Sequence, residues 1–247
     1  MTFNTKKDDK PYGLDSDNLA TEGLTCETSE SNLGDPSMTI DGKNYATIVQ
    51  DTASDELKTN FKKMLTFIKE SSDEDFKAQI GNYIDLKSAM NCMLYGTFSH
   101  MWDYPNKSLI LLTWNSGISW YITFYDLDST WNLFWSGSKL TTENVFDFNH
   151  PENINLSWGN ALFKRIFINF KPELKAQWKK LRTSVWGNNQ IISKFKTFIN
   201  SIPEEAYERD QQKWPDIPSK KITDFAQIQQ SVIERGNAMD EFMENLK

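Results

Sequence analysis

The 247-residue sequence predicts an α+β fold in which a mostly helical body surrounds a buried β-hairpin. Residues 1–53 are rich in turn-forming residues, residues 54–100 and 159–245 carry apolar residues at helical spacing, and residues 108–125 form two apolar runs joined by "NSGI". A composition that is 38% hydrophobic and 13% aromatic supports a sizeable core. We therefore divide the chain into a strand- and loop-rich section, 1–53, and a helical region, 54–247, with a central hairpin at 108–125.

The N-terminal section is expected to contain short strands and long loops. The stretches "KPYGLDSDN" and "NLGDPS" have the chemistry of turns. The stretch "SMTIDGKNYATIVQ" predicts a hairpin whose turn lies at Asp41-Gly42.

Residues 55–100 are predicted to form three helices. The segment "DELKTNFKKMLTFIKE" puts five apolar side chains on one helical face: Leu57, Phe61, Met64, Leu65 and Ile68. In "SSDEDFKAQIGNYI", the spacing of Ser71 and Glu74 predicts a capping box at the start of the second helix. Asp85 is expected to cap the third helix, "LKSAMNCMLYGTFSHM", which is apolar over much of its surface and therefore central.

After a loop-rich stretch at 136–156, the chain is again predicted to be helical. The segments "GNALFKRIFINF" and "KPELKAQWKKLRTSV" flank Pro172, which suits the first turn of a helix. The segments "NNQIISKFKTFINSI" and "PEEAYERDQQKW" follow, and Thr223 is expected to cap a last helix, "TDFAQIQQSVIERGNAMDEFMENL". The basic residues of the first two segments are expected to form a solvated helix face: Lys164, Arg165, Lys171, Lys175, Lys179, Lys180 and Arg182.

The totals disfavour several classes of function. A formal net charge of −7 and a pI of about 5.0 argue against binding to nucleic acid or to anionic membranes. No stretch approaches the roughly 18 apolar residues of a membrane span, and the opening residues lack the apolar core of a secretory signal. Two cysteines and two histidines are too scattered to predict a disulfide framework or a zinc site. The location stays open, with a virion or a cell surface as options for a chain that belongs to a larger assembly.

Three aspartates are placed at the open end of the predicted hairpin. Asp103 lies just before the first strand, and Asp126 and Asp128 lie just after the second, where strand alternation would point both the same way. Like charges held close together are unfavourable unless a cation neutralises them. Carboxylate oxygens suit Mg²⁺, Mn²⁺ or Ca²⁺. From the spacing alone, turn or capping roles explain the same aspartates, so this structural interpretation stays beside the metal site.

The motifs around the hairpin follow one another in a recognisable order. They are Ile84-Asp85 opening a helix, Asp103 near its end, Lys107 before the first strand and Tyr125-Asp126-Leu127-Asp128 after the second. This pattern resembles the CotH-type kinase-like family, which is named for a spore-coat protein. The downstream segments "FKPELKAQWKKLRTSV" and "AYERDQQKWPDI" are also similar to family segments, so that the resemblance covers about residues 55–245.

The resemblance implies an atypical protein-kinase-like fold that binds ATP together with Mg²⁺ or Mn²⁺. An active member would be a metal-dependent phosphotransferase that acts on serine in a protein. By the same resemblance, Asp103 would be the catalytic acid near the attacking hydroxyl or a metal. Asp126 would hold the metal ion, and Asp128 would lie beside it.

The sequence also departs from the family pattern. Lys107 fits the family's lysine, but the family's asparagine falls on Ser108, and Asn106 comes two positions earlier; all three are candidate cofactor-binding residues. Tyr125 replaces the tryptophan of the last motif. The family's strand-rich section, with its phosphate-pairing lysine, is expected to be reduced here, and Lys43 is a weak substitute because a turn lysine explains it more simply. No glycine-rich phosphate loop is found in the sequence.

Two other interpretations stay open. In one, the acidic site is a relic without a cofactor, and the chain is a structural or binding module of a surface, spore or phage-tail (baseplate or fibre) assembly. In that case a protein partner or a larger assembly is expected. In the other, exposed aromatic side chains bind carbohydrate and the acidic cluster binds Ca²⁺.

Histidine and tryptophan side chains near the hairpin have simpler roles than catalysis. His100 lies one helical turn before Asp103 and could orient it, but a core or surface histidine is the simpler interpretation; His150 has no visible partner. The tryptophans around the hairpin are expected to form an aromatic core rather than a stacking site for a sugar or adenine: Trp102, Trp114, Trp120, Trp131 and Trp135.

Overall fold

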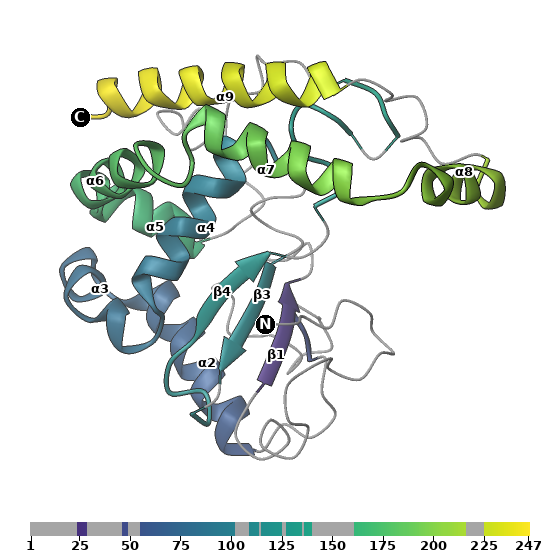
Figure 1. Ribbon diagram of the computed structural model, residues 1–247. Coiled ribbons are helices and arrows are strands. Elements are labelled where there is room, and N and C mark those ends of the chain that lie inside the picture. Colours follow the sequence, from purple (N-terminus) through teal and green to yellow (C-terminus); the bar gives the residue numbers. More distant parts are fainter. Residues whose placement is uncertain are drawn as a thin grey trace. The chain divides into compact units, whose positions relative to one another are not determined.

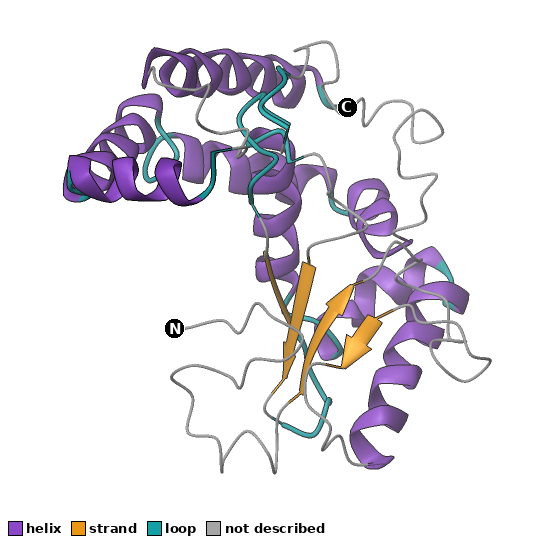
Figure 2. Ribbon diagram, turned by 90° about the vertical axis from the view of Figure 1, so that its right-hand side faces the viewer, coloured by secondary structure: helices purple, strands orange, loops and turns teal. Residues whose placement is uncertain are grey.

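The computed structural model assigns most of the described residues to helices and the rest to a small antiparallel sheet and connecting turns (Figures 1 and 2). This agrees with the predicted α+β class. The described residues are 24–28, 46–48, 55–101, 109–113, 115–124, 127–134, 136–139, 161–215 and 225–247. The chain divides into two compact units: unit 1 comprises Met1–Met93, Asp103–Leu127 and Asp147–Lys171, and unit 2 comprises Leu94–Trp102, Asp128–Phe146 and Pro172–Lys247. The predicted boundary between residues 53 and 54 lies outside the described residues and stays a prediction.

Unit 1 contains the sheet, with strand order β2-β1-β3-β4 and antiparallel pairing throughout. The strands are β1 (Leu24–Thr28), β2 (Ala46–Ile48), β3 (Leu109–Thr113) and β4 (Tyr121–Phe124). The pairing of β3 with β4 confirms the hairpin predicted within 108–125. The other edge of β3 pairs with β1, so that the N-terminal section extends the same sheet. β2 pairs with β1, and the turn predicted at Asp41-Gly42 lies outside the described residues.

The turn between β3 and β4 is a tight one that contacts α2 (Asp55–Glu70). Ser116 and Gly117 both have positive φ, 55° and 76°, as in the type I′ turns that match the twist of paired strands. Gly117 is required here for two reasons. Its φ is positive, and a Cβ at this position would lie 3.2 Å from the Leu57 carbonyl oxygen. Asn60 Nδ2 donates to the Ser116 carbonyl oxygen at 2.8 Å, which ties the turn to α2.

Helices pack against the sheet of unit 1, and α2 runs along one of its faces (Figure 2). Besides α2, the helices are α3 (Asp73–Gln79), the short 3₁₀ helix η1 (Ile80–Asn82), the first part of α4 (Leu86–Phe98) and α5 (Ala161–Asn169). All five apolar residues predicted to share one face of α2 are buried. Asp85 Oδ1 accepts a hydrogen bond from Ser88 N at 2.6 Å, which confirms the predicted cap of α4.

The predicted capping box of α3 is wrong by one residue, and its neighbourhood explains the shift. Ser72 is the cap, because its Oγ accepts from Asp75 N at 3.0 Å. Ser71 Oγ instead accepts from Arg165 Nη1 at 2.9 Å. Arg165 also donates to Asp73 Oδ1 at 2.9 Å, and this hydrogen bond lowers the pKa of the Asp73 carboxyl. Arg165 therefore joins α5 to the start of α3 and does not belong to the predicted solvated face.

Unit 2 is formed by helices and by the turns around residues 99 and 131. Its helices are the end of α4, α6 (Lys171–Arg182), α7 (Asn188–Ser201), α8 (Glu204–Lys213) and α9 (Phe225–Asn245). α7 and α9 pack side by side (Figure 1). Arg182 Nε donates to Asp240 Oδ2 at 2.9 Å, and Trp178 Nε1 donates to Asp240 Oδ1 at 2.9 Å. Arg182 therefore binds α9, and the prediction that it belongs to a solvated helix face is wrong. Thr223 lies outside the described residues.

The predicted aromatic core is confirmed for the tryptophans that the structure describes near the hairpin. Trp120 is fully buried in unit 1, with its ring centroid 4.9 Å from that of Phe61. Trp131 is buried in unit 2, edge-on to Phe98 at 5.2 Å. The remaining predicted members lie outside the described residues: Trp102, Trp114 and Trp135. Within the described part of the chain, no helix has the length and apolarity needed to cross a membrane.

Candidate functional site

The structure describes the residues that flank the predicted acidic site more fully than the site itself. Of the predicted site residues, Asp128 is described, and its side chain is exposed. The others lie outside the described residues: Asp103, Asn106, Lys107, Ser108 and Asp126. Across the described ranges, which include neither Asp103 nor Asp126, no group of three or more His, Cys, Asp or Glu side chains is arranged to hold a metal ion. The convergence of the three aspartates therefore stays a prediction.

The chain that leads to Asp103 leaves α4 through a tightly defined C-terminal cap. Met101 N donates to the Gly96 carbonyl oxygen at 2.9 Å, and His100 N donates to the Thr97 carbonyl oxygen at 3.2 Å. His100 has φ of 53°, so it occupies the left-handed position that glycine usually takes in this Schellman motif. The backbone conformation is thus fixed as far as Met101, the last described residue before Asp103.

The chain that follows Asp128 is bonded to this same cap. Trp131 N donates to the Ser99 carbonyl oxygen at 2.6 Å, and His100 Nδ1 donates to Asn132 Oδ1 at 2.7 Å. Gln227 Nε2 on α9 donates to the Trp131 carbonyl oxygen at 2.8 Å. We call this set, together with Arg235, the polar clamp: Thr97, Ser99, His100, Trp131, Asn132, Gln227 and Arg235.

Arg235, on α9, is the charged centre of the polar clamp. Its side chain is 1% exposed; Nε donates to the Phe98 carbonyl oxygen at 3.2 Å, and Nη2 donates to the Thr97 carbonyl oxygen. These carbonyls belong to the last turn of α4, where carbonyl groups lack partners within the helix and where the helix dipole favours a cation. Burial lowers the pKa of Arg235 to about 10, so the guanidinium keeps its charge at neutral pH.

His100 is a buried member of the polar clamp with a hydrogen-bond partner, as the simpler interpretation of the sequence predicted. Burial, together with the nearby charge of Arg235, lowers the pKa of His100, and the hydrogen bond to Asn132 opposes this only in part. The ring is therefore neutral at pH 7. An amide oxygen can only accept, so the proton of this hydrogen bond is on Nδ1.

Backbone strain is concentrated in the polar clamp. Among the described residues other than glycine, positive φ occurs at His100, Trp131, Asn132 and Ser116. The first three lie in the clamp, and Ser116 lies in the hairpin turn. A left-handed conformation costs a residue with a Cβ roughly 1–2 kcal/mol, and such strain persists where the surrounding structure fixes it, often at functional sites.

Asp103 and Asp128 are both close in the sequence to residues of the polar clamp. Asp103 comes four residues after Ser99, and Asp128 comes three residues before Trp131, while Ser99 and Trp131 are hydrogen-bonded to each other. Asp128 and the polar clamp both belong to unit 2, and Asp103 lies outside the described residues.

Arg235, Gln227 and Asn132 were not predicted from the sequence as members of the polar clamp. A signal for Arg235 was present, because it shares a helical face with Val232, Gly236 and Met239, all of which are buried. A charged residue on the apolar face of a helix indicates a buried partner. Asn132 offered no comparable signal, because its left-handed conformation depends on contacts distant in the sequence.

The family model described as CotH kinase protein matches residues 6–245. This match begins well before residue 55, where the resemblance of the motifs begins, and so it includes most of the N-terminal section. No curated protein matches the chain.

Proposed function

Because the chain belongs to the CotH kinase family, we propose that it binds the phosphates of ATP together with Mg²⁺ or Mn²⁺ through Asp103, Asp126 and Asp128. We also propose that the α+β chain has a kinase-like arrangement and that the phosphate acceptor is a serine of a protein. A bound divalent ion supplies neutralisation of the phosphate oxygens, which is the main requirement of phosphoryl transfer.

Each aspartate has an assigned role. Asp126 and Asp128 are assigned to the metal, because carboxylate oxygens are the hard donors that Mg²⁺ and Mn²⁺ prefer and because the Asp128 side chain is exposed to incoming ligands. Asp103 is assigned to the attacking serine hydroxyl: its carboxylate would accept a hydrogen bond from that hydroxyl. The phosphate groups are assigned to Asn106, Lys107 and Ser108.

The observation that carries this proposal is the polar clamp. A turn or capping role for Asp103 and Asp128 does not require the segments beside them to be bonded together, buried and strained. Two hydrogen bonds, from Trp131 to Ser99 and from His100 to Asn132, join the two segments. His100, Trp131 and Asn132 also have positive φ, so both segments have fixed starting points. Fixed starting points are what positioning of reactive groups requires.

The test is a thermal-shift titration with ATP, with and without Mn²⁺ or Mg²⁺, on the wild-type chain and on Asp126→Ala. Ligand at about 100 times its Kd adds roughly 2.7 kcal/mol to the stability of the wild type. The matched control is Asp210→Ala, because Asp210 is exposed on α8, away from the acidic motifs in the sequence. We expect a metal-dependent rise in melting temperature for the wild type and the control, and none for Asp126→Ala.

A second arm separates binding from transfer. Asp103→Asn should keep the metal-dependent shift and lose transfer of phosphate to a serine-containing protein substrate, because its role is at the hydroxyl. If ATP and metal shift neither the wild type nor the control, the acidic site is a relic and the chain functions as a structural or binding module. A shift with Ca²⁺ and glycan, with ATP inert, would instead identify a carbohydrate-binding domain.

A further inference from the structure

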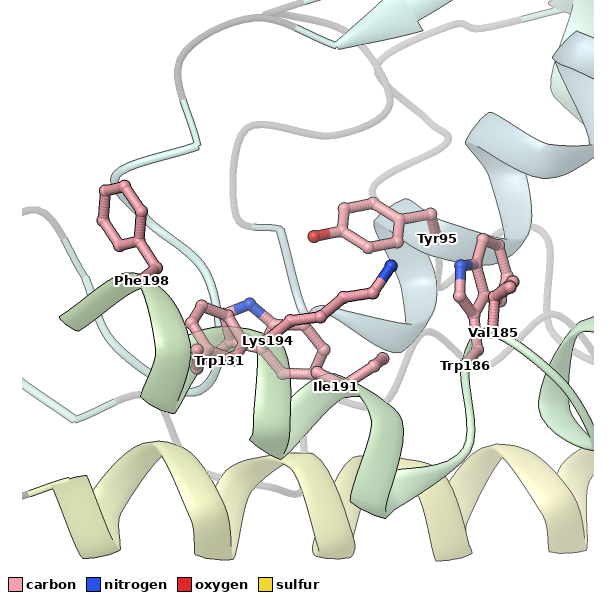
Figure 3. A pocket seen from close by; sticks show the side chains of 8 residues that line it. Tyr95, Trp131, Val185, Trp186, Ile191, Lys194 and Phe198 are labelled. Carbon is pink, nitrogen blue, oxygen red and sulfur yellow. The ribbon is translucent and has the colours of Figure 1, made fainter. Parts of the chain in front are cut away.

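Unit 2 contains a cavity of about 380 Å³ that the proposed metal site does not use. Figure 3 shows its walls, with Tyr95 from α4 facing the side chains of α7. Its lining is largely aromatic and aliphatic and includes one charged residue: Tyr95, Trp131, Val185, Trp186, Ile191, Lys194, Phe195 and Phe198. Its volume lies in the range of sites that bind small apolar groups.

The aromatic walls of the cavity are held in place by one another. The ring centroid of Tyr95 lies 6.3 Å from that of Trp131 and 5.7 Å from that of Trp186. Trp131 is also edge-on to Phe195 at 5.7 Å, and its main chain is fixed by the polar clamp. A cavity with walls fixed in this way is formed before a ligand arrives, which reduces the entropy cost of binding.

The rim of the cavity extends its apolar surface outward. Val185 is 49% exposed and Phe198 is 64% exposed, among the most exposed large apolar side chains of the described residues. A small metabolite would be enclosed by the cavity and would leave this rim uncovered. An apolar rim around a preformed cavity is instead typical of an interface in which one large side chain enters the cavity and its neighbours cover the rim.

The charge around the cavity has the opposite sign to that of the whole chain. The chain carries a formal charge of −7, yet residues 183–201 contain two lysines, Lys194 and Lys196, and no aspartate or glutamate. Lys194 lines the cavity, and in Figure 3 its side chain lies between Trp131 and Trp186. An exposed ammonium group beside an apolar cavity favours a ligand that carries a carboxylate next to its apolar group.

We propose that this cavity is a docking site for a peptide segment of a protein partner in which a tryptophan or phenylalanine lies next to an aspartate or glutamate. The aromatic side chain enters the cavity, the flanking peptide covers Val185 and Phe198, and the carboxylate pairs with Lys194. This site goes beyond the proposed ATP and metal site and does not depend on it. Asp126→Ala should therefore bind such peptides as the wild type does.

The test is a selection of phage-displayed random peptides on the wild-type chain, followed by affinity measurement of the enriched peptides by fluorescence polarisation. We expect enrichment of sequences that place an aromatic residue beside an acidic one. We expect roughly tenfold weaker binding to Phe198→Ser and to Lys194→Glu. Both side chains are exposed, so the variants should fold, which far-ultraviolet circular dichroism will verify.

Matched controls separate the cavity from general stickiness and charge. Lys196→Glu makes the same charge change on α7 outside the cavity lining, and Ile168→Ser removes an exposed apolar side chain on α5. Each should change affinity less than about twofold. The proposal is overturned if no peptide is enriched, or if the enriched peptides bind all the variants equally. It is also overturned if free indole-3-acetate binds as tightly as the peptides and displaces them, because the site would then be specific for small aromatic acids.

Discussion

Replacing Arg235 with methionine removes the charged centre of the polar clamp while keeping a long apolar side chain. The wild-type guanidinium bonds two carbonyl oxygens of the last turn of α4, Thr97 and Phe98. A hydrogen bond from a charged donor contributes roughly 1.5–3 kcal/mol. The Thr97 carbonyl keeps its bond from His100 N at 3.2 Å, so the larger loss is at Phe98.

The opposing effect is desolvation of the guanidinium, which methionine does not require. This desolvation is substantial, because it lowers the pKa of Arg235 to about 10. Weighing the two effects, we expect Arg235→Met to lower the free energy of unfolding by about 2 kcal/mol. For a chain of this size, that corresponds to a fall in melting temperature of about 4–8 °C.

The assay combines urea unfolding with hydrogen exchange of the end of α4. The amides to follow are Ser99 N and Met101 N, whose bonds to Tyr95 and Gly96 carbonyls measure 2.8 and 2.9 Å. The control is Arg209→Met on α8, where the side chain is exposed and a change within about 0.5 kcal/mol is expected. The reasoning is refuted if Arg235→Met costs less than about 1 kcal/mol or leaves the protection of these amides unchanged.

Three further predictions test other parts of the structure. The pKa of His100 lies below its ordinary value of 6.5, so the unfolded state binds more protons than the folded state as the pH falls from about 7.5 to about 5.5, and the free energy of unfolding should fall with it. In urea unfolding over this pH range, His100→Asn should flatten the slope, because asparagine tolerates the left-handed backbone and does not titrate. Gly236→Ala should destabilise by about 1–3 kcal/mol in the same assay, because a Cβ would lie 2.8 Å from Arg182 Cζ; Gly81→Ala, with nothing within 4 Å, should be neutral or slightly stabilising. Asp240→Ala removes the 2.9 Å bond from Arg182 Nε and should cost about 1–2 kcal/mol, and an unchanged urea midpoint would contradict that role.

The sequence predicted those elements whose signals are local. The helical face of α2 and the cap at Asp85 follow from spacing within a single helix, and both are confirmed. The β3–β4 hairpin follows from two apolar runs and a short turn, and it is also confirmed. In each case, residues a few positions apart determine the structure, so a single sequence is sufficient.

Features that depend on distant contacts were missed or misassigned. The pairing of β1 with β3 joins segments about 85 residues apart, and no local pattern indicates it. The cap of α3 moved from Ser71 to Ser72 because Arg165, on α5, binds Ser71 Oγ. The polar clamp was not predicted, because its left-handed residues are held by hydrogen bonds between α4, the turn at residue 131 and α9, which are far apart in the sequence.

The central claim, that the aspartates hold a divalent ion with ATP, is tested most directly by counting bound metal. Electron paramagnetic resonance reports free Mn²⁺, so a titration of the chain with and without ATP gives the stoichiometry and affinity of bound Mn²⁺. The account predicts at least one Mn²⁺ per chain that binds more tightly with ATP, with affinity roughly tenfold weaker in Asp126→Asn and unchanged in Asp210→Asn. Binding that is absent in the wild type, or equal in all three proteins, would contradict it.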